Sequence, residues 1–148
     1  METTITRAAA EDLNDVAPLF ADYRKFYGQP VDLERASAFL ERRLAQGDSA
    51  ILLARRGDQP VGFAQLYPTF SSVALKRVWI LNDLYVAEFA RRSHVATNLI
   101  DQAVSFARQD GAARLILATA IDNSPARALY EKLGWKRDEA FLHYLFSL

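Results

Sequence analysis

Two arginines stand between a strand-like and a helix-like segment, at Arg91 and Arg92. Residues 77–86 before them favour a strand, and residues 93–109 after them have the three-and-four apolar spacing of an amphipathic helix. The first turn of a helix carries unpaired N–H groups and the positive end of the helix dipole, so it attracts anions. The two guanidinium groups add charged donors, and Ser93 is expected to cap the helix. The junction is therefore a candidate phosphate site, and a solvated surface loop is the alternative.

The composition excludes several other kinds of site. The 148 residues include no cysteine and two histidines, His94 and His143, which leaves no thiol nucleophile and little material for a metal cluster. The 18 basic residues balance the 18 acidic ones, which argues against a nucleic-acid partner. No run approaches about 18 apolar residues. Residues 1–10 lack the apolar core of a secretory signal. We expect no metal, no membrane partner and a cytoplasmic location.

The elements that must position the junction follow from periodicity and turn residues. A chain of this length without repeats or linkers predicts a single domain over residues 1–148. The predicted strands are 3–7, 50–54, 61–67, 77–86, 113–119 and two short ones within 135–148, and the predicted helices are 12–27, 33–46, 93–109 and 124–132. This order predicts an α/β domain with a mixed sheet of about six to seven strands flanked by about four helices.

The order of elements and the junction together resemble the GNAT superfamily of N-acetyltransferases. The superfamily signature Arg/Gln-x-x-Gly-x-Gly/Ala aligns with residues 91–96, where Arg91 and Ala96 match and His94 stands in place of the usual Gly. Glycine is favoured there because it lets backbone amides close on a pyrophosphate. We expect His94 to adopt a negative φ in the first helical turn, which leaves those amides available. Its ring would flank the cofactor or face solvent.

A second superfamily segment, Asn-x-x-Ala-x-x-(apolar)-Tyr-x-x-x-Gly-(aromatic), resembles residues 123–135. Asn123, Ala126, Tyr130, Gly134 and Trp135 match it. Taken alone, this stretch is also typical of a helix with a buried apolar face and a packed tyrosine. The two segments occur in the superfamily order, so the resemblance covers nearly the whole chain.

The resemblance implies acetyl-CoA as cosubstrate. The implied contacts are the backbone of Leu84, Tyr85 and Val86, the loop Arg91, Arg92, Ser93 and His94, the helical turn Val95, Ala96 and Thr97, and the pair Asn123 and Ala126. A backbone N–H of Tyr85 or Val86 would polarise the thioester carbonyl. Tyr130 would be the general acid for the departing thiolate. Asn123 would hydrogen-bond the pantetheine arm or the start of the helix.

The general base is the least defined of the implied roles. The run from Leu81 to Val86 resembles the polyamine acetyltransferase branch, which has a Glu before the Asp, but this chain has Asn82 before Asp83. Period-two alternation places Asp83 and Tyr85 on one face of the strand, opposite Asn82 and Leu84. Three roles remain open: a water relay positioned by Asn82, Asp83 as base or amine anchor, and Asp83 as a structural group at a strand bulge.

The acceptor is expected to be a primary amine of a small molecule. Aromatic residues at 23–27 and 67–70 could line a pocket for a cationic amine, or could be core or dimer contacts. Without cysteine no acetyl-thiol enzyme intermediate can form, which favours direct attack in a ternary complex. The alternatives are a protein-lysine or histone-type acetyltransferase and a non-catalytic acyl-CoA-binding module. A homodimer is the superfamily expectation, with residues 141–146 as a possible contact.

Overall fold

The computed structural model describes residues 2–148, which form two compact units whose boundary along the chain lies between Leu117 and Ala118. The first unit holds the sheet and three helices, and the second, Ala118–Leu148, holds one helix. The expectation of one domain over residues 1–148 remains a prediction. Among the described residues, no helix is both long enough and apolar enough to cross a bilayer.

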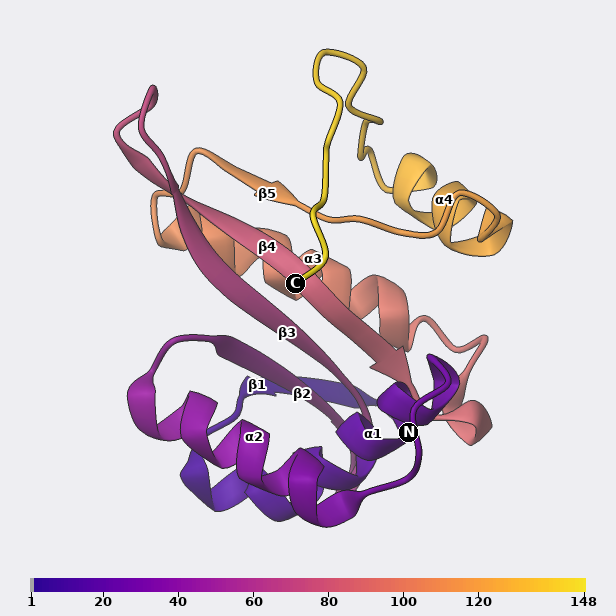
Figure 1. Cartoon of the computed structure of the whole chain (residues 1–148). Helices are drawn as coiled ribbons and strands as arrows, with labels where there is room; N and C mark the ends of the chain where they lie inside the picture. The colour runs from indigo at the N-terminus through magenta and orange to yellow at the C-terminus, as the bar shows by residue number, and fades with distance from the viewer. Residues whose placement is uncertain (1) are drawn as a thin grey trace. The chain divides into compact units, whose positions relative to one another are not determined.

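A five-stranded mixed sheet organises the first unit (Figure 1). In spatial order its strands are β1 (Thr3–Arg7), β2 (Ala50–Arg56), β3 (Gln59–Ser71), β4 (Lys76–Val86) and β5 (Arg114–Ile116). The first four strands pair antiparallel, whereas β5 runs parallel to β4. Parallel neighbours need a crossover, and the helix between β4 and β5 supplies it. The mixed α/β fold expected from the order of elements is therefore confirmed.

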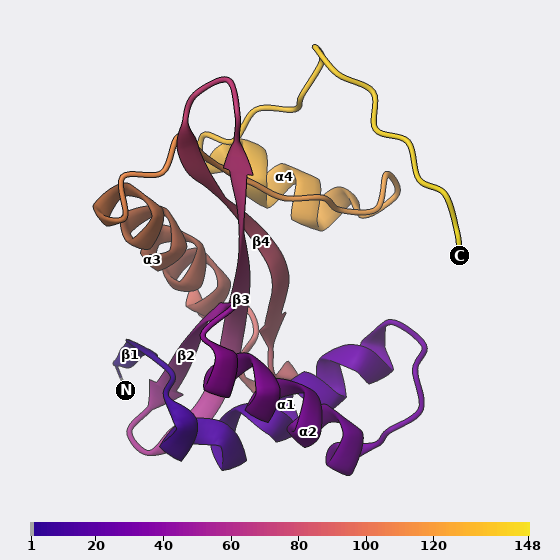
Figure 2. The same cartoon turned by 60° about the vertical axis from the view of Figure 1, so that its left-hand side comes forward.

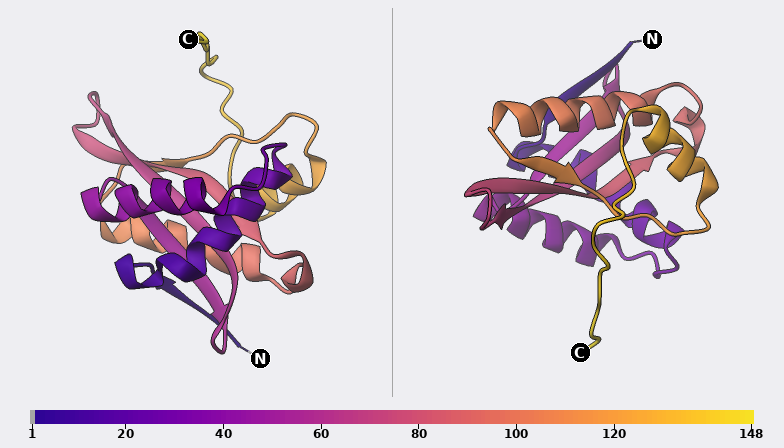
Figure 3. Two further views of the ribbon diagram at one scale, coloured as in Figure 1. Left: turned by 60° about the horizontal axis from the view of Figure 1, so that its bottom comes forward. Right: turned by 90° about the horizontal axis from the view of Figure 1, so that it is seen from above.

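Helices cover both faces of this sheet (Figures 1 and 3). Helices α1 (Leu13–Phe26) and α2 (Leu33–Gln46) lie on one face, and α3 (Val95–Gln109) lies on the other. Short 3₁₀ turns, η1 (Ala10–Asp12) and η2 (Glu88–Ala90), precede α1 and follow β4. Figure 2 shows the long β3–β4 hairpin extending beyond β1 and β2.

The core consists of apolar side chains on both faces of β2 and β3. On the α1–α2 face, the ring of Phe20 stacks on that of Phe39 at 5.7 Å and meets Phe63 edge-on at 6.0 Å. On the α3 face, Leu99 and Ile100 are fully buried. Because both faces of the central strands are covered, one-residue slips would expose this core, and the register of β3 and β4 is strongly specified.

Local signals placed both ends of α2 where the sequence predicted them. Helix α2 spans Leu33–Gln46 as predicted, with the Asp32 carboxylate accepting a hydrogen bond from the Arg35 N–H at 3.0 Å. It ends at Gly47, whose φ of +62° is the left-handed conformation that glycine adopts without strain.

The second unit departs from the sequence prediction. Its helix, α4, spans Ser124–Lys132 as predicted, but no strand forms in residues 135–148, so the described residues contain five strands and not six to seven. Its apolar side chains are exposed, including Phe141 and Phe146. Alternating apolar residues favour a strand only where a partner strand pairs with them, and periodicity does not identify that partner. A homodimer through residues 141–146 remains a prediction.

Candidate functional site

A β-bulge interrupts the pairing of β3 with β4 next to the predicted catalytic residues. Gln65 pairs with Asp83 and the next residue, Leu66, pairs with Leu81, so Asn82 is the extra residue on β4. A bulge re-aims the side chains around it and increases the local twist. Here it turns the run containing Asn82 and Asp83 away from a regular ladder.

Beyond this bulge, β3 is the one strand among the described residues that pairs with β4. Strand β5 pairs with Val78, Trp79 and Ile80, and no pairing with β5 extends to residues 81–86 (Figure 1). Apart from the bulged Asn82, those residues pair with β3 on the other side. Within the first unit, the edge of this segment that faces away from β3 has no strand partner, and an extended ligand can add main-chain hydrogen bonds there.

Alternation along β4 determines which backbone groups face the open edge. The Ala87 N–H donates to the Val61 carbonyl at 2.9 Å, and the Tyr85 carbonyl oxygen lies only 2.8 Å from where a Cβ at Gly62 would be. The backbone groups of residues 85 and 87 thus face β3. Because an antiparallel strand alternates, those of Leu84 and Val86 face the open edge. Of the two N–H groups considered as thioester donors, the one at Val86 has the suitable direction.

Asp83 lies in a buried chain of polar side chains on the α1 side of the sheet. Its side chain is 4% exposed, and its carboxylate accepts from Gln65 Nε2 at 2.6 Å and from Asn82 Nδ2 at 2.9 Å. The Gln65 Oε1 in turn accepts from the Ser49 hydroxyl at 3.0 Å. Buried polar groups are tolerated when they are hydrogen-bonded in this way. Asp83 and Tyr85 share this face, as alternation predicted.

Tyrosines surround this carboxylate. Burial raises the pKa of Tyr23 well above its usual range, and the charge of Asp83 and hydrogen bonding to it add to the effect. Burial, followed by the charge of Asp83, raises the pKa of Tyr67 to about 12. The Tyr23 ring lies 5.0 Å from that of Tyr27 and 6.4 Å from that of Tyr85. The group therefore combines a negative charge with neutral aromatic walls, which is the chemistry that binds a cationic amine.

The loop between β4 and α3 adopts two left-handed residues, Arg92 at φ +62° and His94 at φ +66°. The expectation of a negative φ at His94 is therefore wrong. His94 is the N-cap residue of α3, in the left-handed conformation that glycine adopts readily and that histidine adopts more often than most residues. The family motif usually has glycine at this position because glycine adopts a positive φ without strain. His94 adopts the same conformation at a conformational cost.

Ser93 does not cap α3, which corrects a second expectation. Its hydroxyl donates to the Ala90 carbonyl and accepts from the Arg56 guanidinium, so it ties the loop to η2 and to the end of β2. Arg56 was not among the residues predicted for the site. Charged residues are common at strand ends, and no sequence signal linked this one to the loop.

The two loop arginines have different surroundings. Arg91 Nε donates to the Val86 carbonyl at 3.0 Å, and its guanidinium lies 5.6 Å from the centre of the Tyr85 ring. Arg92 is exposed. Arg91 thus holds the loop against β4, while Arg92 is accessible to a ligand's phosphate.

The first turn of α3 presents backbone donors beside these arginines. The Asn98 N–H donates to the His94 carbonyl at 2.9 Å, which is the first bond of the helical ladder. The N–H groups of Val95, Ala96 and Thr97 precede it and have no acceptor within the helix. Val95 is buried against the sheet, where its Cγ1 is 3.3 Å from a Cβ built at Gly62. This packing directs the helix N-terminus toward the loop.

The second unit contains the other predicted site residues. The Asn123 side chain accepts from the Ala126 N–H at 3.3 Å and caps α4. The rings of Tyr130 and Trp135 lie 5.9 Å apart, and the Trp135 N–H donates to the Tyr130 carbonyl at 3.0 Å. The structure therefore gathers Asn82, Asp83 and the residues at 84–97 in the first unit, and Asn123, Ala126 and Tyr130 in the second.

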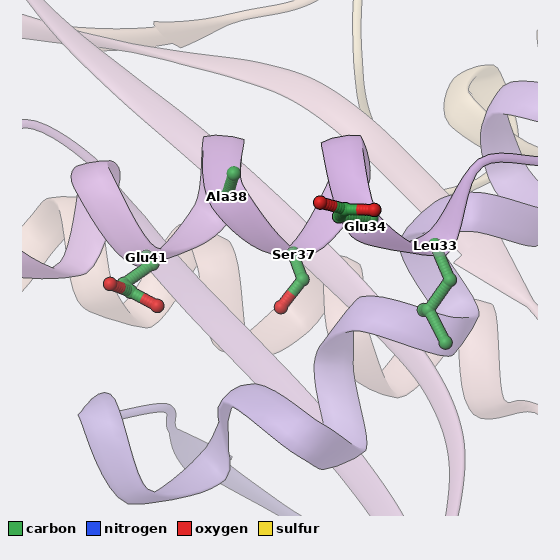
Figure 4. Close-up of a pocket in the computed structure, with 5 residues that line it drawn as sticks. All are labelled: Leu33, Glu34, Ser37, Ala38 and Glu41. Atoms are coloured by element: carbon green, nitrogen blue, oxygen red, sulfur yellow. The ribbon is translucent and has the colours of Figure 1, made fainter.

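A surface hollow and the distribution of metal-binding side chains were compared with the predicted site residues. An open hollow of about 600 Å³ lies along α2, lined by Leu33, Glu34, Ser37, Ala38 and Glu41 (Figure 4). None of these is a predicted site residue. Within residues 2–148, no three His, Cys, Asp or Glu side chains are grouped to hold a metal ion.

The chain is similar to known acetyltransferases. Residues 15–135 match the family described as "Acetyltransferase (GNAT) family". An uncharacterized N-acetyltransferase of Bacillus subtilis, YhfO, is 45% identical over 97% of each chain. A crystal structure of a probable acetyltransferase is also 45% identical, covers 98% of this chain and 97% of its own, and superposes with a TM-score of 0.94. An aminoglycoside N(6')-acetyltransferase type 1 of Acinetobacter genomosp. 13 is 26% identical over 70% of this chain and 74% of its own.

Proposed function

Because the chain belongs to the acetyltransferase (GNAT) family and is an N-acetyltransferase of that family, we propose that it acetylates a primary amine of a small molecule. The acetyl donor is acetyl-CoA, whose thioester supplies an activated acyl group. The amine attacks the thioester carbonyl directly while both substrates are bound, since the chain has no cysteine to hold the acetyl group.

One observation carries the cofactor half of this proposal. The open edge of β4 over residues 81–86 leads through a short loop into the unpaired N–H groups of α3. An extended arm that ends in phosphates fits this order, with its amides along the strand and its pyrophosphate at the helix N-terminus. Arg92 adds a charged donor there. The outward N–H of Val86 is suited to donate to the thioester carbonyl oxygen.

The acceptor half is supported by the surroundings of Asp83. A buried carboxylate among Tyr23, Tyr67 and Tyr85 attracts an ammonium group and can anchor it or accept its proton. Asn82 cannot accept a proton at neutral pH, and its role is to orient the carboxylate or a water. The relative named as an aminoglycoside acetyltransferase acts, by that name, on an amine-bearing small molecule, which agrees with this substrate class.

Tyr130 is the proposed general acid for the thiolate. We expect Tyr130→Phe to lower kcat at least about 10-fold while leaving the dissociation constant of acetyl-CoA within about 2-fold, because only a proton donor is lost. Steady-state kinetics and isothermal titration measure the two quantities. Trp135→Phe, which alters the neighbouring ring and removes no acid, is the matched control. Unchanged kcat in Tyr130→Phe would remove the acid role.

The test of the function is a thiol-release assay against a panel of acceptors. The panel contains diamines, polyamines, amino acids, an aminoglycoside and a lysine-containing peptide, each with acetyl-CoA. The proposal expects turnover with at least one small amine and much weaker turnover with the peptide. Preference for the peptide would indicate a protein acetyltransferase. Binding of acetyl-CoA without turnover on any acceptor would indicate an acyl-CoA-binding module.

A further inference from the structure

Gln65 is a polar side chain at the centre of the sheet. It lies on β3 with a side chain that is 0% exposed, in a strand whose neighbours Val61, Phe63 and Leu66 are also fully buried. Burying an amide among apolar side chains lowers stability unless both of its ends are hydrogen-bonded. Both ends of Gln65 are bonded, to Ser49 and to Asp83. In the sequence, Gln65 stands out as a single polar residue within the apolar run 61–66. Its partners could not be predicted because they are distant in the sequence.

The hydrogen bonds determine which way the amide points. The Gln65 NH₂ group donates to the carboxylate oxygen Oδ2 of Asp83 at 2.6 Å. The Gln65 oxygen then faces Ser49, whose hydroxyl donates to it at 3.0 Å. Rotating the amide by half a turn would oppose two acceptors at Asp83. The Ser49 hydroxyl therefore stabilises the one orientation in which Gln65 donates to Asp83.

The same pattern fixes the plane of the Asp83 carboxylate. Its second oxygen, Oδ1, accepts from Asn82 Nδ2 at 2.9 Å, so each carboxylate oxygen has an amide donor. Gln65 and Asp83 are also cross-strand partners at the bulge that makes Asn82 the extra residue. Side chains directly opposite one another on paired strands interact most strongly. The carboxylate is thus held from two sides by the fold.

We propose that Ser49 and Gln65 are positioning residues for the transfer reaction: they hold the Asp83 carboxylate in one orientation, toward the acceptor amine. This inference rests on the proposed function, in which Asp83 meets that amine. Neither residue touches the acetyl donor's edge of β4. Removing a hydrogen bond between Ser49, Gln65 and Asp83 is therefore expected to raise the KM for the amine and to leave acetyl-CoA binding unaltered.

The test compares four variants with the amine that the panel identifies as the best acceptor. Ser49→Ala removes the donor to Gln65, and Gln65→Met removes the donor to Asp83 at nearly unchanged volume. We expect the KM for the amine to rise about 5-fold in Ser49→Ala and about 10-fold or more in Gln65→Met, with the KM for acetyl-CoA within about 2-fold of wild type. Ser49→Thr, which keeps the hydroxyl, should restore the amine KM.

Leu66→Met is the matched control, since it alters the next buried side chain on β3 without touching the polar chain. It is expected to change stability but neither KM. The inference would be overturned if the Ser49→Ala and Gln65→Met variants both fold and both keep the wild-type KM for the amine. So would an equal rise in both KM values in every variant, which is the pattern of a general structural effect.

A second measurement separates this inference from the proposed function. The side-chain NH₂ signals of Gln65 in a ¹H–¹⁵N spectrum report its hydrogen bond to Asp83 without any turnover. They should shift, and exchange faster with solvent, in Ser49→Ala but not in Ser49→Thr. If wild type acetylates no amine while these signals respond, the proposed function fails, and the hydrogen bonds by which Ser49 and Gln65 orient Asp83 are still supported. If they do not respond, the positioning inference itself is wrong.

Discussion

His94 illustrates how a single residue can be strained by a functional loop. Its φ of +66° places a Cβ-bearing side chain in the left-handed region, which is unfavourable by roughly 1–2 kcal/mol relative to a helical conformation. The loop requires this conformation because the chain must turn from η2 into α3 while presenting its N–H groups. The positive φ of His94 therefore lowers the stability of the fold, and it lets the start of α3 present its backbone N–H groups to a ligand.

The first prediction at this scale is that His94→Gly stabilises the protein. Removing the Cβ relieves the strain and should raise the free energy of unfolding by roughly 0.5–1 kcal/mol, measured by urea denaturation. Gln102→Gly, at an exposed position inside α3, is the control and should lower it by a similar amount. A destabilised His94→Gly would show that the imidazole makes contacts that outweigh the strain.

Arg92 provides the second prediction at the residue scale. Because its side chain is exposed beside the α3 N-terminus, Arg92→Ala should weaken acetyl-CoA binding by about 5- to 10-fold through loss of one charged hydrogen bond. Arg42→Ala removes an equally exposed charge from α2 and should leave the dissociation constant unchanged. Titration calorimetry at two salt concentrations measures both. An unaltered dissociation constant in Arg92→Ala would show that Arg92 is a solvated surface residue and does not contact the cofactor.

At the scale of elements, the close approach of β3, β4 and α3 depends on Gly62. A Cβ there would lie 2.8 Å from the Tyr85 carbonyl oxygen, 3.3 Å from Val95 Cγ1 and 3.4 Å from Leu99 Cδ1. The oxygen belongs to the backbone of β4 and cannot rotate away. The absence of a side chain at residue 62 therefore keeps β4 and the start of α3 in their relative positions.

We accordingly predict that Gly62→Ala lowers the free energy of unfolding by about 2–3 kcal/mol and weakens acetyl-CoA binding, because overpacking displaces the strand that lines the edge. Gly47→Ala, where nothing lies within 4 Å of the new Cβ, should lower stability by only about 1 kcal/mol and leave binding intact. Denaturant titration and calorimetry measure these effects. Equal losses at the two glycines would contradict the steric explanation.

At the scale of the whole molecule, a cosubstrate that binds only the folded chain must stabilise it. Acetyl-CoA at about 100 times its dissociation constant should add about 2.7 kcal/mol to the free energy of unfolding and raise the Tm. Differential scanning fluorimetry at several acetyl-CoA concentrations measures this, with dephospho-CoA and free adenine as graded controls. A Tm that stays constant up to millimolar acetyl-CoA would contradict the cofactor assignment.

Local sequence signals were sufficient to predict the four helices, the strands of the first unit and the family. Helix α2 begins at its Asp32 cap and ends at Gly47 because caps and glycine act over a few residues, and those signals are local. The two motif segments around Arg91 and Asn123 could also be identified from the sequence, because each motif spans only a few neighbouring residues. The acetyltransferase family follows from them.

The assembly of the site in the first unit depends on contacts between residues that are distant in the sequence. The Ser49, Gln65 and Asp83 chain joins residues 16 and 18 positions apart, and the bulge at Asn82 exists only in the register of two paired strands. The left-handed His94 was missed because helical periodicity does not report a loop's φ. The strands expected within residues 135–148 were wrong because an apolar pattern does not supply a partner. Pairing and register are non-local, so they emerge when the sheet forms.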